Sequence, residues 1–325
     1  MLTKEQFELI QQAAVSCIEI ELEAISNLYK WINEDFLKTV ETIFESKGRL
    51  VVTGIGKSAI IGQKIVATFN STGTPSVFMH AADAIHGDLG MIKAEDLVLC
   101  ISKSGETPEI KVLIPLVKSL GSKLIAMVSN ETSSLALQSD YLLVTPITQE
   151  ADPNNLAPTA STTAQLVMGD AMAVALLALR GFSPNDFAQF HPGGSLGKQL
   201  YLKVKNVYPG HEKPKVFASA TLKEVILEMT SKRLGVTAVL DANEYLIGII
   251  TDGDLRRMLQ NSVSLDQLTA VDIMSANPKT VEPETLAIEA FRILKDKNIN
   301  QLLVVENLNY LGVIHIHDLI KEGMI

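Results

Sequence analysis

The apolar residues of this chain follow two different patterns. Over residues 4–47 they recur at helical spacing between Glu and Lys side chains, which predicts one or two long amphipathic helices that serve packing or subunit contact. Short apolar runs then alternate with helical stretches, and helices are predicted at residues 59–70, 108–120 and 159–180. The runs are RLVVTGIG, PSVFMH, DLVLCIS, KLIAMVS and YLLVTPI. This alternation predicts an α/β domain with a parallel sheet and helices on both faces, closing near residue 205.

The C-terminal part contains an internal repeat. Residues 221–255 align with residues 285–319, and both copies carry Thr-Leu at the start, a glycine before an apolar pair, and Asp-Leu at the end. Each copy is predicted to fold as helix, strand, turn, strand and helix. The repeat resembles a tandem pair of CBS domains, a regulatory module of α+β repeats, which we expect at residues 206–268 and 269–325.

The composition is that of a globular protein, with 47% hydrophobic and 20% charged residues among 325. This length predicts two domains, or one domain with an appended module. The formal net charge of −9 disfavours nucleic acid and anionic membranes as partners. The longest apolar run near the middle, residues 171–179, is far shorter than the ~20 residues that cross a bilayer, and the first residues show no signal pattern, so we expect a cytoplasmic protein. Two cysteines, Cys17 and Cys100, predict buried thiols rather than a disulfide framework.

A glycine-rich segment, Gly54-Ile55-Gly56-Lys57-Ser58, joins a predicted strand to a predicted helix. Free N–H groups and the helix dipole at such a junction favour an anion. The segment does not fit an ATP-binding P-loop, because Val51 stands where that motif needs glycine. It does not fit a dinucleotide site either, because the second strand lacks an acidic residue at its end. A phosphate ligand therefore remains the functional interpretation.

A second segment of this kind, residues 102–109 (SKSGETPE), also lies between a predicted strand and helix. Ser102, Ser104 and Thr107 supply hydroxyls, the glycine can adopt positive φ, and the proline suits a first helical turn. This composition fits either a second phosphate cradle or an ordinary capping motif. Lys57 in the first segment likewise fits either phosphate binding or a solvated lysine at a helix start.

Two further loops carry titratable side chains, Glu150 and His191, on either side of the helix predicted at residues 159–180. Loops at the carboxyl edge of a parallel sheet are where ligands bind. Together the motifs resemble the sugar isomerase (SIS) domain of the arabinose 5-phosphate isomerase family, in which two CBS domains follow. The motifs are GIGKSAIIGQKIVATFNSTGTPSVFMHAADAIHGDLGMI, ISKSGETPEI, LAPTASTTAQLVMGDAMAVALL and FHPGGSLG. The resemblance spans about residues 5–325 and implies a Rossmann-like, flavodoxin-like SIS domain at residues 1–205.

The resemblance implies a reversible conversion of D-ribulose 5-phosphate to D-arabinose 5-phosphate through an enediol, without a cofactor. The product would supply the 3-deoxy-D-manno-octulosonate (Kdo) pathway of lipopolysaccharide or capsule. The family's functional positions fall on Lys57, Glu109, Glu150 and His191. We expect Glu150 as the carbon base with Glu109 as the alternative, because burial could raise the pKa of either carboxyl. His191 would transfer a proton at the ring oxygen, and Lys57 would stabilise the enediolate or the phosphate. The implied substrate-binding residues are Gly54, Ser58, Gly73, Thr74, His86, Ser102, Ser104 and Thr107.

The resemblance also implies assembly and regulation. We expect a homotetramer in which His191 enters the active site of a neighbouring subunit. The CBS pair implies an adenine nucleotide or a sugar nucleotide, unless the pair serves only assembly. The residues implied at that site are Thr251, Asp254 and Asp318. No metal is required, although His80 and His86 resemble a site where relatives take up an inhibitory zinc.

Two other functions compete with this interpretation. A sugar-phosphate sensor without catalytic activity could use the same domain, but such regulators begin with a basic helix-turn-helix, whereas residues 1–47 are rich in Glu. An isomerase of another sugar phosphate, such as a hexulose phosphate, would share the motifs. The CBS pair argues against this only by association.

Overall fold

The structure of the protein is a computed structural model that describes residues 1–210, 212–260 and 267–324. Internal contacts divide the chain into two compact units, Met1–Phe190 and His191–Ile325. Each unit has its own sheets and its own hydrophobic clusters and is described by itself.

The first unit is built on a parallel sheet of five strands in the order β2-β1-β3-β4-β5. The strands are β1 (Leu50–Gly54), β2 (Ser76–His80), β3 (Leu97–Ile101), β4 (Lys123–Val128) and β5 (Tyr141–Val144). Each one lies within an apolar run seen in the sequence, so the predicted sheet is confirmed. The order is that of flavodoxin-like folds, in which the chain reverses its winding direction between β1 and β3.

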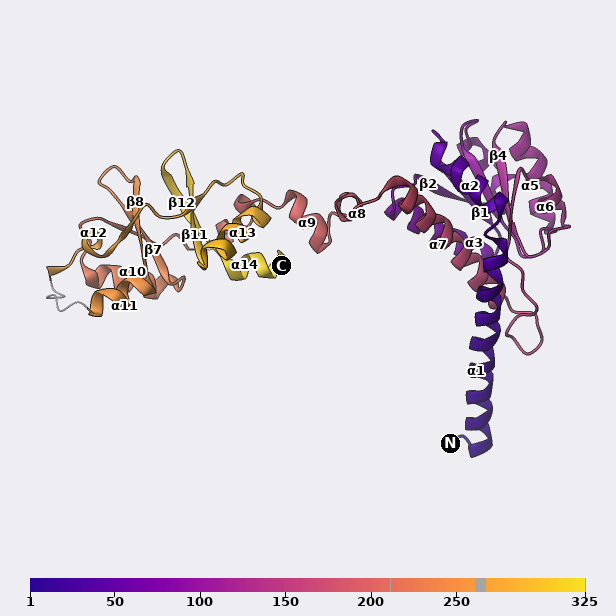
Figure 1. Ribbon diagram of the computed structural model, residues 1–325, viewed down its shortest axis with the longest axis horizontal. Coiled ribbons are helices and arrows are strands. Elements are labelled where there is room, and N and C mark those ends of the chain that lie inside the picture. Colours follow the sequence, from indigo (N-terminus) through magenta and orange to yellow (C-terminus); the bar gives the residue numbers. More distant parts are fainter. Residues whose placement is uncertain (211, 261–266, 325) are drawn as a thin grey trace. The chain divides into compact units, whose positions relative to one another are not determined.

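Helices cover both faces of this sheet (Figure 1), as the continuous burial of the strands requires. Along β1, Leu50 and Val52 face one hydrophobic cluster and Val51 faces the other. The first cluster contains the end of α1 with α2, α3 and α7, and the second contains α4, α5 and α6. These helices and the remaining ones of the unit are α1 (Lys4–Asn27), α2 (Glu34–Glu45), α3 (Lys57–Ser71), α4 (Ala81–Ala84), α5 (Pro108–Ser119), α6 (Ser134–Gln138), α7 (Ala160–Arg180) and α8 (Pro184–Phe190), with 3-10 turns η1 (Leu28–Trp31) and η2 (Asp88–Met91).

Two helices of this unit differ in how far their apolar side chains are buried. Helix α1 extends beyond the sheet (Figure 1), and Phe7, Ile18 and Leu22 are each more than half exposed. Helix α7 is long and apolar enough to span a membrane by length and composition. In this unit, however, Ala164, Met168 and other side chains of α7 lie fully buried in the first cluster, as in the core helix of an α/β domain.

The second unit consists of two similar α+β halves, which confirms the predicted repeat. In both halves the antiparallel hairpin pairs the repeat's glycine with a valine, Val239 with Gly248 and Val304 with Gly312, and the register shifts directly after each valine. The first half contains β6 (Lys215–Phe217), α10 (Leu222–Lys232), β7 (Val236–Leu240), β8 (Leu246–Thr251), α11 (Asp252–Gln260), α12 (Ala270–Ile273) and β9 (Ser275–Ala276). The second contains β10 (Thr280–Val281), α13 (Ala287–Lys297), β11 (Gln301–Glu306), β12 (Asn309–His315) and α14 (Ile316–Lys321).

The segment before the repeat packs with the second unit, although the sequence suggested that the first domain closes near residue 205. It contains α9 (Ser195–Tyr201), η3 (Val204–Asn206) and η4 (Tyr208–Gly210). Val204 is fully buried in the cluster of the second half, and Lys198 pairs with Glu322 at 2.7 Å. The contact boundary therefore lies at residue 190, before α9.

The two cysteines differ in exposure. Cys100 on β3 is buried, as expected, whereas Cys17 on α1 is only half-buried. Burial raises the pKa of the Cys100 thiol to about 12.

Candidate active site

The two glycine- and serine-rich segments meet at the carboxyl ends of β1 and β3. Gly54 at the end of β1 pairs in register with Ile101 at the end of β3. The loops that follow these strands enclose a pocket of about 210 Å³. It is lined by Ile55, Ser58, Ile101, Ser102, Lys103, Ser104, Thr107 and Ile110. The pocket lies at the point where the strand order reverses, which is where open α/β sheets bind ligands.

The first loop brings the start of α3 to this pocket. Gly56 adopts φ +60 and occupies the N-cap position without a side chain to cap the helix, so the first N–H groups of α3 keep no side-chain partner there. Lys57 is exposed at the first helical position. Ser58 is half-buried, and its hydroxyl donates to Gln165 Oε1 on α7 at 3.2 Å. This loop therefore offers N–H groups, a cation and a hydroxyl.

The second loop is a compact turn of hydroxyl side chains. Ser102 Oγ accepts from the N–H of Gly105 at 3.1 Å, and Ser104 Oγ accepts from the N–H of Glu106 at 3.2 Å. Gly105 has φ +66, and an added Cβ would lie 2.1 Å from Ser133 Oγ, so only glycine fits. Thr107 is the N-cap of α5 without a capping hydrogen bond from its side chain. The prediction of a capping motif at this point is thus only partly met, because the hydroxyls bond within the loop rather than to the helix.

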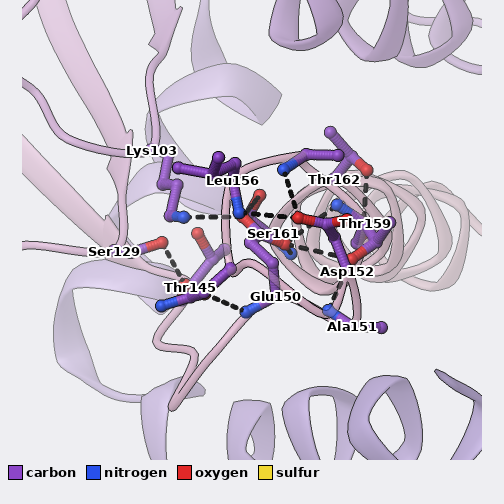
Figure 2. Close-up of polar contacts among 12 residues, drawn as sticks. Lys103, Ser129, Thr145, Glu150, Ala151, Asp152, Leu156, Thr159, Ser161 and Thr162 are labelled. Carbon is purple, nitrogen blue, oxygen red and sulfur yellow. Dashed lines mark hydrogen bonds and ion pairs between the residues drawn. The ribbon is translucent and has the colours of Figure 1, made fainter. Parts of the chain in front are cut away.

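Glu150 lies in the loop before α7, and its buried carboxylate contacts the residues that begin this helix. Its side chain is 0% exposed, and its Oε2 accepts from the N–H groups of Thr159 at 2.8 Å and Ser161 at 3.1 Å. Its Oε1 accepts from the Ser161 hydroxyl at 2.6 Å and pairs with Lys103 Nζ at 2.7 Å. Figure 2 shows Lys103 and Ser161 directed at this carboxylate. The N–H of Glu150 donates to Asn155 Oδ1 at 2.7 Å, so the backbone is fixed as well.

The predicted direction of the Glu150 pKa shift is wrong. Desolvation by burial does act to raise the pKa, but hydrogen bonds from Lys103, from the Ser161 hydroxyl and from two backbone N–H groups outweigh it and lower the pKa to about 2. A carboxylate has about four lone-pair sites, and these donors occupy them. In this arrangement Glu150 is a stable anion and a weak base.

Glu109 has a different environment. It lies in the first turn of α5, two residues after Thr107, and is half-buried. Within the ranges 1–210, 212–260 and 267–324, its carboxylate makes no hydrogen bond or ion pair. Of the two carboxylates predicted as the carbon base, Glu109 is the one with free lone pairs.

Two predicted substrate residues lie away from the pocket, which corrects the sequence interpretation. Gly73 and Thr74 precede β2, whose first residue pairs with the first residue of β1, so they lie at the amino edge of the sheet. Thr74 is buried, and its Oγ1 accepts from Arg180 at 2.5 Å. Their proximity in sequence to the first loop misled the prediction, because α3 carries the chain to the opposite edge.

The two histidines of the predicted zinc site lie at or after the end of β2, at the carboxyl edge of the sheet, where the pocket lies. His80 ends β2 in register with Gly54, and His86 is exposed beyond α4. His80 Nδ1 lies 3.7 Å from Asp83 Oδ2. Among the residues that the structure describes, no group of three or more His, Cys, Asp or Glu side chains is arranged to hold a metal ion.

The remaining predicted residues belong to the second unit. His191 is its first residue. Asp254 is 6% exposed, and its carboxylate accepts from Thr251, Ser275 and Arg257 at 2.5–2.8 Å. Asp318 lies on α14 in the second half.

A cleft of about 450 Å³ in the second unit includes Thr251 but not Asp254. It is lined by residues of both halves: Gly235, Ile249, Thr251, Asp252, Gly253, Ser275, Ala276, Asn277, Pro278, Lys279, Asn298, Ile299, Asn300 and Gln301. Asp254 instead lines a neighbouring pocket of about 380 Å³ with Arg257 and Met258. Thr251 and Asp254, the two residues of the first half that were predicted to bind a nucleotide, thus line different cavities.

Three residues of the site were missed by sequence reasoning. Lys103 lines the pocket, Ser161 holds Glu150, and Gln165 holds Ser58. The Nε2 of Gln165 is buried without a partner among the described residues. A lysine between two serines was a visible signal, whereas Ser161 and Gln165 sit in a helix whose small and apolar residues indicated only packing.

Comparisons with known proteins identify the two kinds of domain in the chain. The SIS domain family matches residues 42–175, and the CBS domain family matches residues 204–261 and 270–324. The chain is 46% identical over 316 residues to arabinose 5-phosphate isomerase KdsD of Escherichia coli K12, covering 97% of this chain and 96% of that protein. It belongs to the arabinose 5-phosphate isomerase family.

Two further relatives fit the family. KdsD of Pseudomonas aeruginosa is 47% identical over 314 residues, covering 96% of each chain. The structure of the Escherichia coli CFT073 protein c3406 in complex with arabinose 5-phosphate matches 59% of this chain and 100% of that chain, with 40% identity and a TM-score of 0.55. The predicted architecture, a SIS domain followed by two CBS domains, is confirmed.

Proposed function

We propose that this protein interconverts D-ribulose 5-phosphate and D-arabinose 5-phosphate and thereby supplies the Kdo pathway from the cytoplasm. The SIS domain, which is predicted from the sequence at residues 1–205 and whose compact unit ends at Phe190, would carry the reaction. CBS domains at residues 206–268 and 269–325 would regulate it. The observation that supports this best is the pocket between β1 and β3, where two loops with hydroxyls and helix N-termini meet. The first turn of α5, which follows the second loop, carries Glu109, a carboxylate that has no partner among the described residues. Membership of the arabinose 5-phosphate isomerase family gives the substrate.

The second loop would hold the phosphate. Because Ser104 Oγ already accepts a backbone N–H, its own O–H proton is left for an anion, and the same holds for Ser102 apart from a 3.4 Å contact with Thr107. Thr107 and the first N–H groups of α5 complete the cradle. Ser58 would line it from the first loop, and Gly54 would approach the substrate from the end of β1, next to the lining residue Ile55.

Proton transfer would then occur at C1 and C2 of the sugar. A carboxylate removes a proton from C1 of the ketose while O2 gains one, which gives the enediol, and the proton returns at C2 while O1 loses one to form the aldehyde. We propose Glu109 as this base, because its carboxylate has no hydrogen bond or ion pair within the described part of the chain, while that of Glu150 is saturated. Lys57 would stabilise charge on the enediolate, and His191 of a neighbouring copy would assist at the ring oxygen. His86 would bind substrate from the third loop of this edge.

Assembly into a homotetramer is part of the proposal. The apolar side of α1 is exposed, and so is a groove of about 750 Å³ between α2 and α7, lined by apolar side chains such as Leu37, Phe44 and Leu179. Contiguous exposed apolar surface of this kind is typical of interfaces between subunits. Light scattering of the purified protein should give four times the chain mass of 35.3 kDa.

A nucleotide or sugar nucleotide would bind the CBS pair. The cleft with Thr251, Asp252 and Lys279 offers a hydroxyl, a carboxylate and a cation from the two halves. Asp254 would take part only if its hydrogen bonds from Thr251 and Ser275 were replaced by hydrogen bonds from the nucleotide. Titration calorimetry with adenine nucleotides and with a cytidine sugar nucleotide distinguishes the two classes, and absence of heat with both would leave assembly as the role of the pair.

The proposed activity is tested by incubating the protein with D-arabinose 5-phosphate and measuring the ketose formed. Turnover without added metal or nucleotide is expected. Binding of D-arabinose 5-phosphate without turnover would favour a sugar-phosphate sensor. If a parallel assay showed turnover of a hexulose phosphate and none of D-arabinose 5-phosphate, the protein would be an isomerase of that other sugar phosphate.

A further inference from the structure

Lys103 is the strongest feature of the site that the proposed reaction leaves without a role. It lies in the second loop between Ser102 and Ser104, and it lines the pocket. Its side chain is 40% exposed, whereas that of its partner Glu150 is 0% exposed. The ion pair therefore joins a fully buried anion to a partly exposed lysine that is one of the residues lining the pocket.

The anion of this pair is fixed by its surroundings. Glu150 accepts hydrogen bonds from the backbone N–H groups of Thr159 and Ser161 and from the Ser161 hydroxyl, all at 3.1 Å or less. These donors belong to the N-cap and first turn of α7, whose later residues lie in the core. A carboxylate held in this way defines where the ammonium group of Lys103 sits.

The ammonium group has donors to spare. It carries three N–H donors, and in the described part of the chain its one polar contact is Glu150 Oε1 at 2.7 Å. The neighbouring hydroxyls of Ser102 and Ser104 direct their bonds within the loop and line the same pocket. Among the described residues the ammonium group thus keeps two open donors, and Ser102 and Ser104 add two hydroxyls to the same pocket lining. Donors of these two kinds match the oxygens of a phosphate group.

We propose that Lys103 is a substrate-binding cation that contacts the phosphate group, and that Glu150 is a positioning residue that orients it. This inference rests on the proposed function for the identity of the substrate. It also explains why a fully buried carboxylate stands so close to a site for an anion: Glu150 acts through Lys103 and is shielded by it.

The test compares Lys103→Met with Lys64→Met. Lys64 pairs with Asp170 at 2.5 Å between α3 and α7 and does not line the pocket, so it is a matched control for loss of an ion pair. Inorganic phosphate is titrated by calorimetry, and KM and kcat are measured with D-arabinose 5-phosphate. We expect Lys103→Met to raise the Kd of phosphate and the KM by about tenfold or more, with kcat nearly unchanged. Lys103→Arg should recover part of the loss, and Lys64→Met should change neither value.

Two further variants separate positioning from folding. Lys103→Met leaves a buried carboxylate without its cation, so the double variant Lys103→Met/Glu150→Gln removes both charges and should remain folded with the same weak phosphate binding. Glu150→Gln alone should weaken phosphate binding several-fold, because the ammonium group of Lys103 loses the anion that positions it. Unchanged phosphate Kd in folded Lys103→Met, or a fall in kcat at constant KM, would overturn the proposal. Phosphate binding is measured without turnover, so failure of the isomerase activity would be seen separately.

Discussion

The buried carboxylate of Glu150 should make the stability of the first unit depend on pH in the acid range. Its pKa is about 2 in the folded protein against an ordinary value of 4.5. This difference corresponds to about 3 kcal/mol of stabilisation at neutral pH. Because the folded pKa is the lower one, the stabilisation is fully present above about pH 4.5 and is lost as the pH falls toward 2.

Glu150→Gln removes this dependence, since an amide does not ionise. Urea unfolding followed by the fluorescence of Trp31 measures it, because this is the one tryptophan of the sequence and it packs against the cluster that contains α7. At pH 6 the variant should be less stable than the parent protein by up to about 3 kcal/mol, and the gap should shrink by about 2 kcal/mol at pH 3.

Asp170→Asn is the control, because it removes an exposed carboxylate of α7 from its ion pair with Lys64. It should change the free energy of unfolding by about 1 kcal/mol or less. A gap between Glu150→Gln and the parent protein that stays constant from pH 6 to pH 3 would refute the assignment of Glu150 as a buried anion.

Three further predictions concern the site and the core. Glu109→Gln should lower kcat by about 100-fold or more while phosphate binding stays the same, and an active variant would return the role of base to Glu150. Gly105→Ala should lower the free energy of unfolding by about 3 kcal/mol in the same urea titration, because the added Cβ would clash with Ser133. Gly121→Ala is the control: Gly121 has φ +81 but open space around it, so its loss should be about 1 kcal/mol. Equal losses for the two variants would contradict the clash with Ser133. Cys100, with a pKa of about 12, should react with a thiol reagent only after denaturation, and rapid labelling of the native protein would show that β3 is accessible.

Much of the fold could be predicted because its signals are local. Each strand of the first sheet coincides with a short apolar run, and Gly181 ends α7 in the left-handed conformation typical of a helix C-terminus. The short helices α4 and α6 were not predicted, since four or five residues carry too little periodicity. The segment around Val204 could not be assigned to a unit from the sequence, because its partners lie on α13 and β11.

The site was less predictable, since its chemistry depends on contacts between distant residues. The hydroxyl loops were visible, but Ser58 and Gln165 are 107 positions apart, and their bond has no local signal. The pKa of Glu150 was predicted in the wrong direction for the same reason. Burial alone raises a carboxyl pKa, and only the fold brings Lys103 and Ser161 to this carboxylate.

The most direct test of the proposed function is proton NMR of the purified protein with D-ribulose 5-phosphate in D₂O, without added metal or nucleotide. The C1 and C2 signals of the arabinose, ribose and ribulose phosphates are followed over time. An enediol isomerase should produce D-arabinose 5-phosphate with deuterium at C2, because the base exchanges its proton with solvent before returning it. Ribose 5-phosphate as product would contradict the proposed stereochemistry, and no product despite saturable binding would contradict the isomerase itself.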